Sequence, residues 1–214
     1  MSGKIDYTGK LILAPMVRIG TLPTRLLALD YGADLVYTEE IIDWRLLRSK
    51  RVVNPAIGTV DYIDESDDTL VLRLSPEREK GHLVLQIGTC DPNRAVKVAK
   101  MVAQDVDAID VNMGCPKAFS LKGGMGAALM TQPKKVEAIL TSLVKAVDIP
   151  VTCKIRVFND VQKTLDLIDV RVGLRILFNS MCSSFDLGYP THRRVGRCRS
   201  WKDERAEAQP RKQR

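Results

Sequence analysis

The sequence predicts an α/β fold, in which helices cover a parallel β-sheet. Short and nearly continuous apolar runs recur along the chain, and each is followed by a segment with apolar residues at helical spacing. Such unbroken runs are typical of strands that are buried on both faces, as in parallel sheets. Pro15, Gly32 and Pro150 mark segment boundaries, because these residue types tend to end or begin strands and helices.

Five core strands and five helices are expected in alternation over the first 168 residues. Thr21 and Asp91 are suitable N-caps for two of the helices. Between the second helix and the third strand, the runs 59–63 and 69–74 flank the acidic sequence DESDD and predict an inserted hairpin. The expected strands are 11–16, 35–40, 82–88, 108–114 and 151–157, and the expected helices are 22–29, 41–50, 92–102, 134–147 and 159–168.

A doubly wound sheet and a (β/α)8 TIM barrel share this alternation, and the positions of the polar residues favour the barrel. Unusual residues lie at or just after the C-terminal ends of all five strands, where barrel active sites are built. No GxGxxG motif follows the first strand, which counts against a dinucleotide-binding sheet. Only about five of the eight strand–helix units are expected, so the barrel would be C-terminally truncated. The strand-end residues are Pro15, Met16, Glu39, Glu40, Gln86, Asn112, Cys115, Lys154 and Arg156.

The alternation stops near residue 169, and the last part of the chain has a different composition. Residues 171–214 contain 11 Lys and Arg and 4 Asp and Glu, which leaves 22 of each sign for the preceding residues. The whole net charge of +7 therefore lies in this tail, and it is weak evidence that the folded part binds nucleic acid. We expect one domain over residues 9–168 and a basic, disordered tail over residues 169–214.

The composition is that of a soluble globular protein, with 45% apolar and 28% charged residues. No apolar run reaches the roughly 18–20 residues that cross a bilayer, and the N-terminus has no secretory signal. The five cysteines are scattered, without a CxxC pair or a His cluster, so we expect reduced thiols and no bound metal. These features favour a cytoplasmic protein that does not associate with membranes.

Cys115 is the first candidate catalytic residue. A lone cysteine near an apolar strand usually only fills space, but Gly114 and Pro116 form a fixed turn that displays this thiol. Asn112 lies one pleat earlier and offers an amide to the same edge. The thiol could act as a general acid or as a nucleophile, although neither histidine stands at a spacing that suggests a base partner.

Other strand-end residues suit an anionic or heterocyclic ligand. Lys154 and Arg156 share one face of the fifth strand, and a lysine inside a parallel sheet is costly unless it is paired. Gln86 could hydrogen-bond a heterocycle or be a satisfied polar residue of the rim. The loop LKGGMGAAL places backbone N–H groups near Lys122, as in an anion site or in a flexible surface loop.

The sequence resembles the tRNA-dihydrouridine synthases, and most closely the eukaryotic class that acts on position 20 of tRNA. The resemblance covers about residues 9–168 and rests on LAPMVRIGTLPTRLLALDYGAD, VLQIGTCDPNRAVKVAKMV, IDVNMGCPKAFSLKGGMGAALM and PVTCKIR. It implies a barrel enzyme with flavin mononucleotide (FMN) that reduces the C5–C6 bond of uridine in the tRNA D-loop. In such an enzyme reduced flavin gives a hydride to C6, the loop cysteine protonates C5, and NAD(P)H reduces the flavin again.

The resemblance also assigns roles to residues of this chain. It implies that Cys115 is the proton donor and that tRNA is the partner, whose uridine must leave the stacked RNA to be reduced. It further implies that Asn112, Lys122 and Arg156 lie near the flavin or the substrate. The residues that match the flavin-contacting positions are Ala14, Pro15, Met16, Gln86 and Lys154.

The sequence departs from the family after KIR at residues 154–156. The family continues with three further strands that carry histidine–glycine–arginine and asparagine–glycine–glycine motifs and a glycine turn for the flavin phosphate, and these are missing from this sequence. Three interpretations stay open: a dihydrouridine synthase, an inactive fragment or isoform whose basic tail at most binds RNA, and a flavin-dependent reductase of a free pyrimidine.

Overall fold

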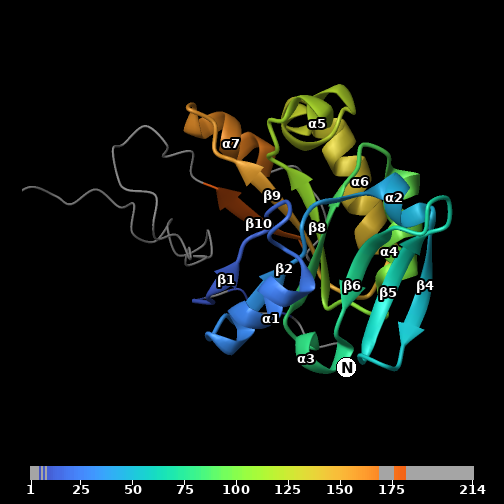
Figure 1. Ribbon diagram of the computed structural model, residues 1–214. Helices are drawn as coiled ribbons and strands as arrows, with labels where there is room; N and C mark the ends of the chain where they lie inside the picture. The colour runs from blue at the N-terminus through green and yellow to red at the C-terminus, as the bar shows by residue number, and fades with distance from the viewer. Residues whose placement is uncertain (1–4, 6, 8, 169–175, 182–214) are drawn as a thin grey trace, which may run out of the picture.

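The computed structural model describes residues 5, 7, 9–168 and 176–181, with residues 161, 165, 168 and 176–181 described by their backbone alone. Its main element is a seven-stranded parallel sheet (Figure 1). Six strands follow one another across the sheet, and the short strand β3 also pairs with β7. In spatial order the six strands are β1 (Ile12–Leu13), β2 (Leu35–Tyr37), β7 (Leu83–Gly88), β8 (Ala108–Met113), β9 (Val151–Arg156) and β10 (Ile176–Met181), and β3 is Ile41–Ile42.

The order of the strands confirms a barrel of the (β/α)8 type. Each core strand pairs with the next core strand along the chain, whereas a doubly wound sheet reverses its order at a switch point. The sheet curls in Figure 1, and helices cover its outer side. The described strands therefore form an open part of a (β/α)8 barrel, and their C-terminal ends meet at one rim.

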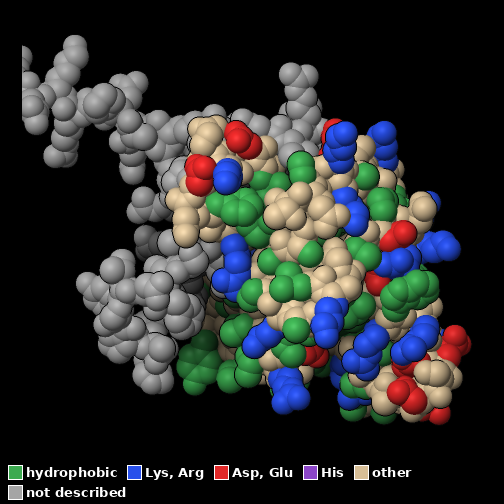
Figure 2. Space-filling view, turned by 90° about the horizontal axis from the view of Figure 1, so that it is seen from above, with side chains coloured by type: hydrophobic (Ala, Val, Ile, Leu, Met, Phe, Trp, Pro, Cys, Tyr) green, Lys and Arg blue, Asp and Glu red, His purple; other side chains and the backbone are tan. Residues whose placement is uncertain are grey.

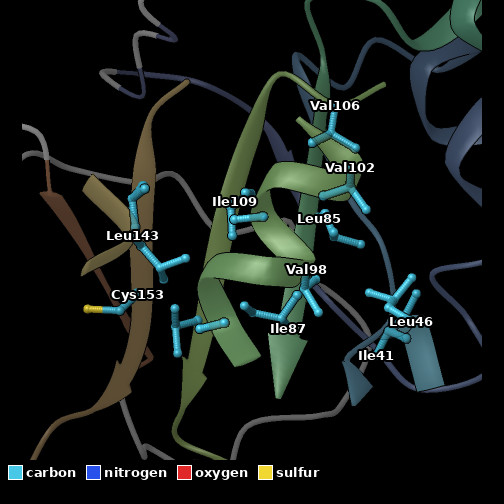
Figure 3. Close-up of a cluster of buried hydrophobic side chains, with 14 of the residues drawn as sticks. Ile41, Leu46, Leu85, Ile87, Val98, Val102, Val106, Ile109, Leu143 and Cys153 are labelled. Carbon is cyan, nitrogen blue, oxygen red and sulfur yellow. The ribbon is translucent and has the colours of Figure 1, made fainter. Parts of the chain in front are cut away.

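Helices α1 (Leu22–Asp30), α4 (Pro92–Val102), α6 (Pro133–Ala146) and α7 (Val161–Ile168) follow core strands, as the sequence predicts. Asp91 caps α4, because its carboxylate accepts a hydrogen bond from the N–H of Arg94 at 2.9 Å. Helix α6 buries Val136, Ile139, Leu140 and Leu143, which lie on one face at helical spacing. Figure 3 shows Leu143 and residues of α4 packing on strands β7, β8 and β9. Among the described residues, no helix is long and apolar enough to cross a membrane.

An antiparallel sheet is inserted between β3 and β7, and the sequence predicted it only in part. Strands β5 (Thr59–Asp64) and β6 (Leu70–Leu74) form the expected hairpin. The expected helix 41–50 was too long, because α2 spans only Asp43–Leu47 and the chain then enters β4 (Ser49–Asn54). Strand β4 pairs with β5 along its whole length, and this pairing between distant residues overrides the helical spacing of the sequence. The short helices α3 (Pro76–Glu79) and α5 (Ala118–Lys122) and the 3-10 helix η1 (Gly126–Thr131) complete the fold.

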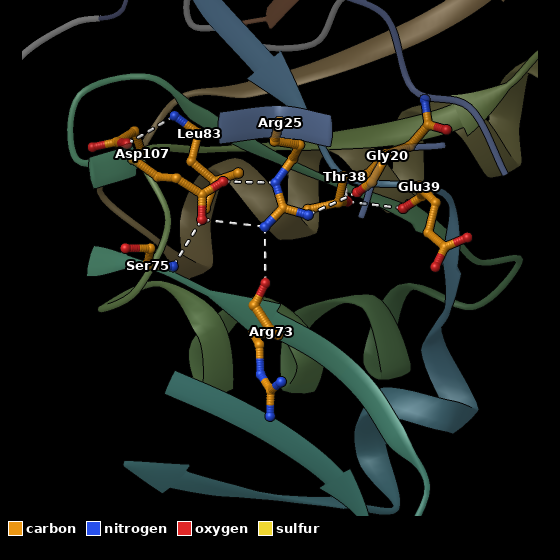
Figure 4. Close-up of polar contacts among 10 residues, drawn as sticks. Gly20, Arg25, Thr38, Glu39, Arg73, Ser75, Leu83 and Asp107 are labelled. Atoms are coloured by element: carbon orange, nitrogen blue, oxygen red, sulfur yellow. Dashed lines mark hydrogen bonds and ion pairs between the residues drawn. The ribbon is translucent and has the colours of Figure 1, made fainter. Parts of the chain in front are cut away.

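A buried ion pair joins the inserted sheet to the barrel (Figure 4). Arg25 of α1 donates from Nε to Oε1 of Glu79 at 2.6 Å, and both side chains are about 1% exposed. The guanidinium also donates to the backbone oxygens of Gly20 and Arg73, at 2.7 and 2.8 Å. The second carboxylate oxygen of Glu79 accepts from the N–H of Ser75 at 2.8 Å. The cluster therefore fixes α1, the loop after β1 and the end of β6 relative to one another.

Strand β10 lies within the segment 169–214, for which the sequence predicted a disordered tail. It pairs in parallel with β9 along six residue pairs, from Ile176–Val151 to Met181–Arg156. The remainder of the predicted tail lies outside the described residues, so its predicted disorder stays a prediction.

Candidate active site

A cavity of about 210 Å³ opens at the C-terminal rim of the sheet. Figure 2 looks down on this side of the molecule, where Lys and Arg side chains lie among hydrophobic ones. Six of the predicted site residues line the cavity together, although they come from four separate strand ends. They are Pro15, Gln86, Asn112, Cys115, Lys154 and Arg156, and the other lining residues are Val17, Glu40, Gly114, Pro116, Lys117 and Ile155.

The other three predicted site residues do not line this cavity. Ala14 and Met16 flank Pro15 in the loop after β1, and the Met16 side chain is 40% exposed. Lys122 is the last residue of α5 and is exposed to solvent. Their predicted contacts with flavin or substrate therefore remain predictions.

Asn112 builds the turn that presents the thiol of Cys115. Its Oδ1 accepts hydrogen bonds from the N–H groups of Gly114 and Cys115, both at 3.0 Å. Arg156 of the adjacent strand donates from Nε to the backbone oxygen of Gly114 at 2.5 Å. The turn is thereby held from two strands, and Cys115, which is partly exposed, faces the cavity.

The glycine-rich loop packs directly against this turn. The backbone N–H of Ala127 donates to the oxygen of Cys115 at 2.9 Å. Gly126 has a φ of +57°, and a Cβ added there would lie 2.6 Å from the Cys115 oxygen and 2.4 Å from Oγ of Ser120. A side chain at residue 126 is therefore excluded both by backbone conformation and by close contact.

We expect the substitution Gly126→Ala to destabilise the fold by about 1–3 kcal/mol, because the new methyl group must displace the backbone at Cys115. Urea unfolding measures the stability, and peptide mapping after alkylation should show faster modification of Cys115. Gly124→Ala is a matched control, since Gly124 has a similar φ of +69° but its added Cβ would be 3.7 Å from the nearest atom, in Cys90. Equal effects of the two substitutions would show that contact with the Cys115 turn is unimportant.

Asp110 does not line the cavity but binds Gln86, which does, and it was not identified from the sequence. It is fully buried in β8 and accepts hydrogen bonds from Nε2 of Gln86 at 2.7 Å and from Oγ1 of Thr152 at 2.6 Å. The first of these bonds orients the Gln86 amide, whose Oε1 then accepts from Nδ2 of Asn112 at 3.4 Å. Burial raises the pKa of Asp110 to about 6, and the hydrogen bonds and the charge of Lys154 offset part of that rise.

The raised pKa of Asp110 predicts that its contribution to stability depends on pH. A carboxyl group whose pKa is raised on folding favours the folded state below its unfolded pKa of about 3.9, and this contribution is lost as the pH rises through about 6. The stability of the native chain relative to Asp110→Asn should fall by about 2–3 kcal/mol between pH 4 and pH 7. Urea unfolding of both proteins across this range tests the prediction, and a difference that does not change with pH would contradict it.

Glu40 is a second residue of the site whose importance the sequence did not reveal. The sequence places it at a strand end, but nothing in the sequence indicates that its carboxyl group is buried. The structure places Oε1 out of contact with solvent, without a hydrogen-bond partner among the described residues. Burial raises the pKa of Glu40 to about 7, and the nearby amide of Asn112 offsets a part of this effect.

Two basic residues of β9 complete the cavity. Lys154 pairs in register with Asn112 of β8, and its side chain faces the cavity with that of Arg156. Burial lowers the pKa of Lys154, the charge of Asp110 raises it in part, and the charge of Arg156 lowers it further. The described residues contain no group of three or more His, Cys, Asp or Glu side chains that could hold a metal ion. The cavity is thus lined by a thiol, two amides, a carboxyl group and the basic side chains of β9.

These features define an α/β-barrel protein with a candidate active site at the C-terminal rim of its sheet. The chain belongs to the dihydrouridine synthase family, whose sequence pattern matches residues 12–172. It is 47% identical over 173 residues to the tRNA-dihydrouridine(20) synthase [NAD(P)+] of Saccharomyces cerevisiae, covering 77% of this chain and 45% of that protein. The enzyme of the same name from Schizosaccharomyces pombe is 43% identical, covering 78% of this chain and 36% of that protein.

A relative with a different tRNA position in its name is also similar. The tRNA-dihydrouridine(16/17) synthase of Schizosaccharomyces pombe is 39% identical over 157 residues, which cover 73% of this chain and 36% of that protein. The chain spans less than half the length of each of these three relatives. The comparisons therefore confirm the family that the sequence motifs indicated.

Proposed function

We propose that the chain carries the N-terminal part of the catalytic barrel of an FMN-dependent tRNA-dihydrouridine synthase, which reduces the C5–C6 bond of a uridine in the tRNA D-loop. The observation that carries this proposal is the convergence of Cys115, Asn112, Gln86 and Lys154 on one cavity at the rim. The similarity to tRNA-dihydrouridine(20) synthases supports the choice of substrate. The names of these relatives also support NAD(P)H as the reductant.

The residues of the cavity fit the ring system of FMN. Pro15 and Val17 provide an apolar wall, Gln86 and Asn112 provide amides, and Lys154 provides a positive charge. The volume of about 210 Å³ is smaller than the roughly 300–1,000 Å³ of typical ligand pockets, so it suits the ring better than the whole mononucleotide. Of the predicted contacts, Pro15, Gln86 and Lys154 would hold the ring in this cavity.

The residues of the chain would supply acid catalysis and charge balance. When bound, reduced FMN supplies the hydride that adds to C6 of the uracil ring. Cys115 would then give its Sγ proton to C5, and the turn fixed by Asn112 and Arg156 would keep the thiol at the required place. Lys154 would balance negative charge on the reduced ring, and Asp110 would hold the Gln86 amide in one orientation.

The surface around the cavity suits an unpaired segment of RNA. Arg18, Lys117 and Lys122 are exposed there, and the aromatic side chain of Phe119, which lies in α5 with Lys122, is 54% exposed. Exposed cations attract the phosphates, and exposed aromatic rings can stack on bases. Figure 2 shows basic and hydrophobic side chains interspersed on this face. We infer that tRNA would approach the site from this side.

The first experiment is a visible absorption spectrum of the purified 214-residue chain after incubation with FMN and desalting. A retained visible absorption band of oxidised flavin is expected if the described part of the barrel holds the ring, and uridine reduction in tRNA is then assayed with NADPH. A colourless protein would overturn the proposed activity for this chain. It would favour the alternative of an inactive fragment, for which binding of tRNA with a steep salt dependence is the diagnostic result.

A further inference from the structure

The loop that follows β1 carries an exposed apolar tip at the mouth of the cavity. The side chains of Met16, Val17 and Ile19 are 40%, 60% and 46% exposed. Of the large hydrophobic side chains that are exposed in the described part of the chain, only that of Val17 lines the cavity. Because more than half of its surface is in solvent, the Val17 side chain extends beyond the wall of the cavity and forms part of its rim.

The backbone of this loop is fixed by hydrogen bonds and by a close approach of two main-chain segments. Oε2 of Glu39 accepts from the N–H of Arg18 at 2.8 Å, and the N–H of Gly20 donates to the oxygen of Met16, also at 2.8 Å. The oxygen of Gly20 accepts from Nη1 of the buried Arg25 at 2.7 Å (Figure 4). A Cβ added to Gly20 would lie 2.4 Å from the backbone nitrogen of Glu39. The tip is therefore held rigidly against the end of β2.

Arg18, between the exposed Val17 and Ile19, has a left-handed backbone conformation with a φ of +65°. This conformation is unfavourable for a residue of this type, and such strain is concentrated at binding and catalytic sites. Adjacent apolar side chains in solvent are likewise a mark of interaction surfaces. Neither the acid catalysis by Cys115 nor the charge balance by Lys154 makes use of this tip. The loop thus has the features of a preorganised contact surface.

The chemistry of the proposed substrate indicates what this surface contacts. A uridine that enters the cavity must leave the base stack of the RNA, and the neighbouring bases then lose a stacking partner. Proteins that unstack nucleic acids commonly insert an apolar side chain between the bases. The exposed guanidinium of Arg18 also places a positive charge at the tip, where it would attract the phosphates of the flanking nucleotides.

We propose that Val17, with Ile19 beside it, is a wedge that enters the gap left by the extruded uridine and packs on the flanking base of the RNA. This inference rests on the proposed function and deepens it, because it assigns the residue that stabilises the unstacked substrate. A valine at the mouth is next to the gap when the uridine is in the cavity. A tip that is already rigid loses little conformational freedom when it binds, which favours this role.

The test uses two RNA hairpins that carry the D-loop sequence. In the first, the nucleotide on the 5′ side of the target uridine is 2-aminopurine, whose fluorescence rises when it loses its stacking partner. In the second, this nucleotide is an abasic residue, so the uridine has no stacking on that side to lose. Dissociation constants of the full chain for both hairpins are measured by fluorescence anisotropy of an end label, at one fixed concentration of FMN.

The variants are Val17→Ala, Val17→Leu, which keeps the apolar bulk, and the matched control Val53→Ala. Val53 is 59% exposed in β4 and does not line the cavity. Thermal unfolding of each variant shows that it is folded. The readout is the ratio of the two dissociation constants measured on the same protein. An effect of Val17 on FMN binding, or on RNA affinity in general, cancels in this ratio.

The fluorescence of 2-aminopurine should rise when the native chain, Val17→Leu or Val53→Ala binds. Val17→Ala should bind this hairpin about tenfold more weakly, because apolar contact equivalent to two methyl groups is lost, but should bind the abasic hairpin nearly as well as the native chain does. Equal weakening for both hairpins, no weakening, or native binding without a rise in fluorescence would overturn the inference alone. A native chain that binds neither hairpin would overturn the proposed function as well.

Discussion

Replacement of Cys115 by Ala is expected to lower the rate of uridine reduction in the flavin-loaded chain by about 10²–10⁴-fold. The thiol lines the cavity at the end of β8, where its turn donates a hydrogen bond to Asn112 and accepts one from Arg156. Loss of the Sγ proton removes general-acid catalysis at C5 but leaves the residues that would hold the flavin in place. Flavin binding should therefore remain within a factor of about two, a change within the scatter expected for a substitution that removes no cofactor contact.

Rapid-mixing experiments measure the reduction of the flavin by NADPH separately from its reoxidation by tRNA. NADPH should reduce the flavin of Cys115→Ala at the native rate, whereas reoxidation by tRNA should be slow. Cys90→Ala is the matched control, because Cys90 is also partly exposed and its Sγ lies 3.3 Å from Nη2 of Arg94 on the same rim. Native reoxidation rates in Cys115→Ala would refute the assignment of this residue as the proton donor.

The sequence predicts that the site residues converge at the rim, because polar side chains at the ends of parallel strands meet at one edge of the sheet. Gln86, Asn112 and Lys154 belong to three strands that are neighbours in the structure, so their convergence follows from the strand order alone. Asp110 could have been found by the argument that singled out Lys154, since a charged residue inside an apolar strand is costly unless it is paired. The sequence does not reveal that its partners are Gln86 and Thr152, which lie on two other strands.

Strand β4 of the inserted sheet and the burial of Glu40 could not be predicted from local sequence patterns. Residues 41–50 have helical spacing, yet strand β4 depends on pairing with β5, whose residues lie 5 to 15 positions further along the chain. The burial of Glu40 likewise depends on Gly88, a residue 48 positions away. Both features arise from contacts between distant segments, and the periodicity of a single segment carries no information about them.

The buried pair Arg25–Glu79 should have the largest effect on stability. Substitution of Arg25 by Met, or of Glu79 by Gln, is expected to destabilise the fold by about 3–5 kcal/mol, because each leaves a buried group of the opposite charge without its partner. Both side chains are about 1% exposed, and the guanidinium also satisfies two backbone oxygens. The double substitution should be less destabilising than the sum of the two single ones, since no buried charge is then left unpaired.

Urea unfolding of the two single variants and the double variant measures the interaction free energy between Arg25 and Glu79. Arg78→Met is the matched control, because Arg78 forms an ion pair with Asp30 at 2.6 Å in which the side chains are 51% and 57% exposed, and such a pair contributes little. Equal losses of stability for Arg25→Met and Arg78→Met would contradict the prediction.

The substitution Arg25→Met should also disturb the rim of the barrel, because Arg25 donates a hydrogen bond to the oxygen of Gly20. The same oxygen accepts from the N–H of Glu39 at 3.3 Å, and Glu39 precedes Glu40 in the chain. Weaker FMN binding by Arg25→Met than by Arg78→Met, measured well below the unfolding midpoint of each, would show that this pair also positions the candidate site.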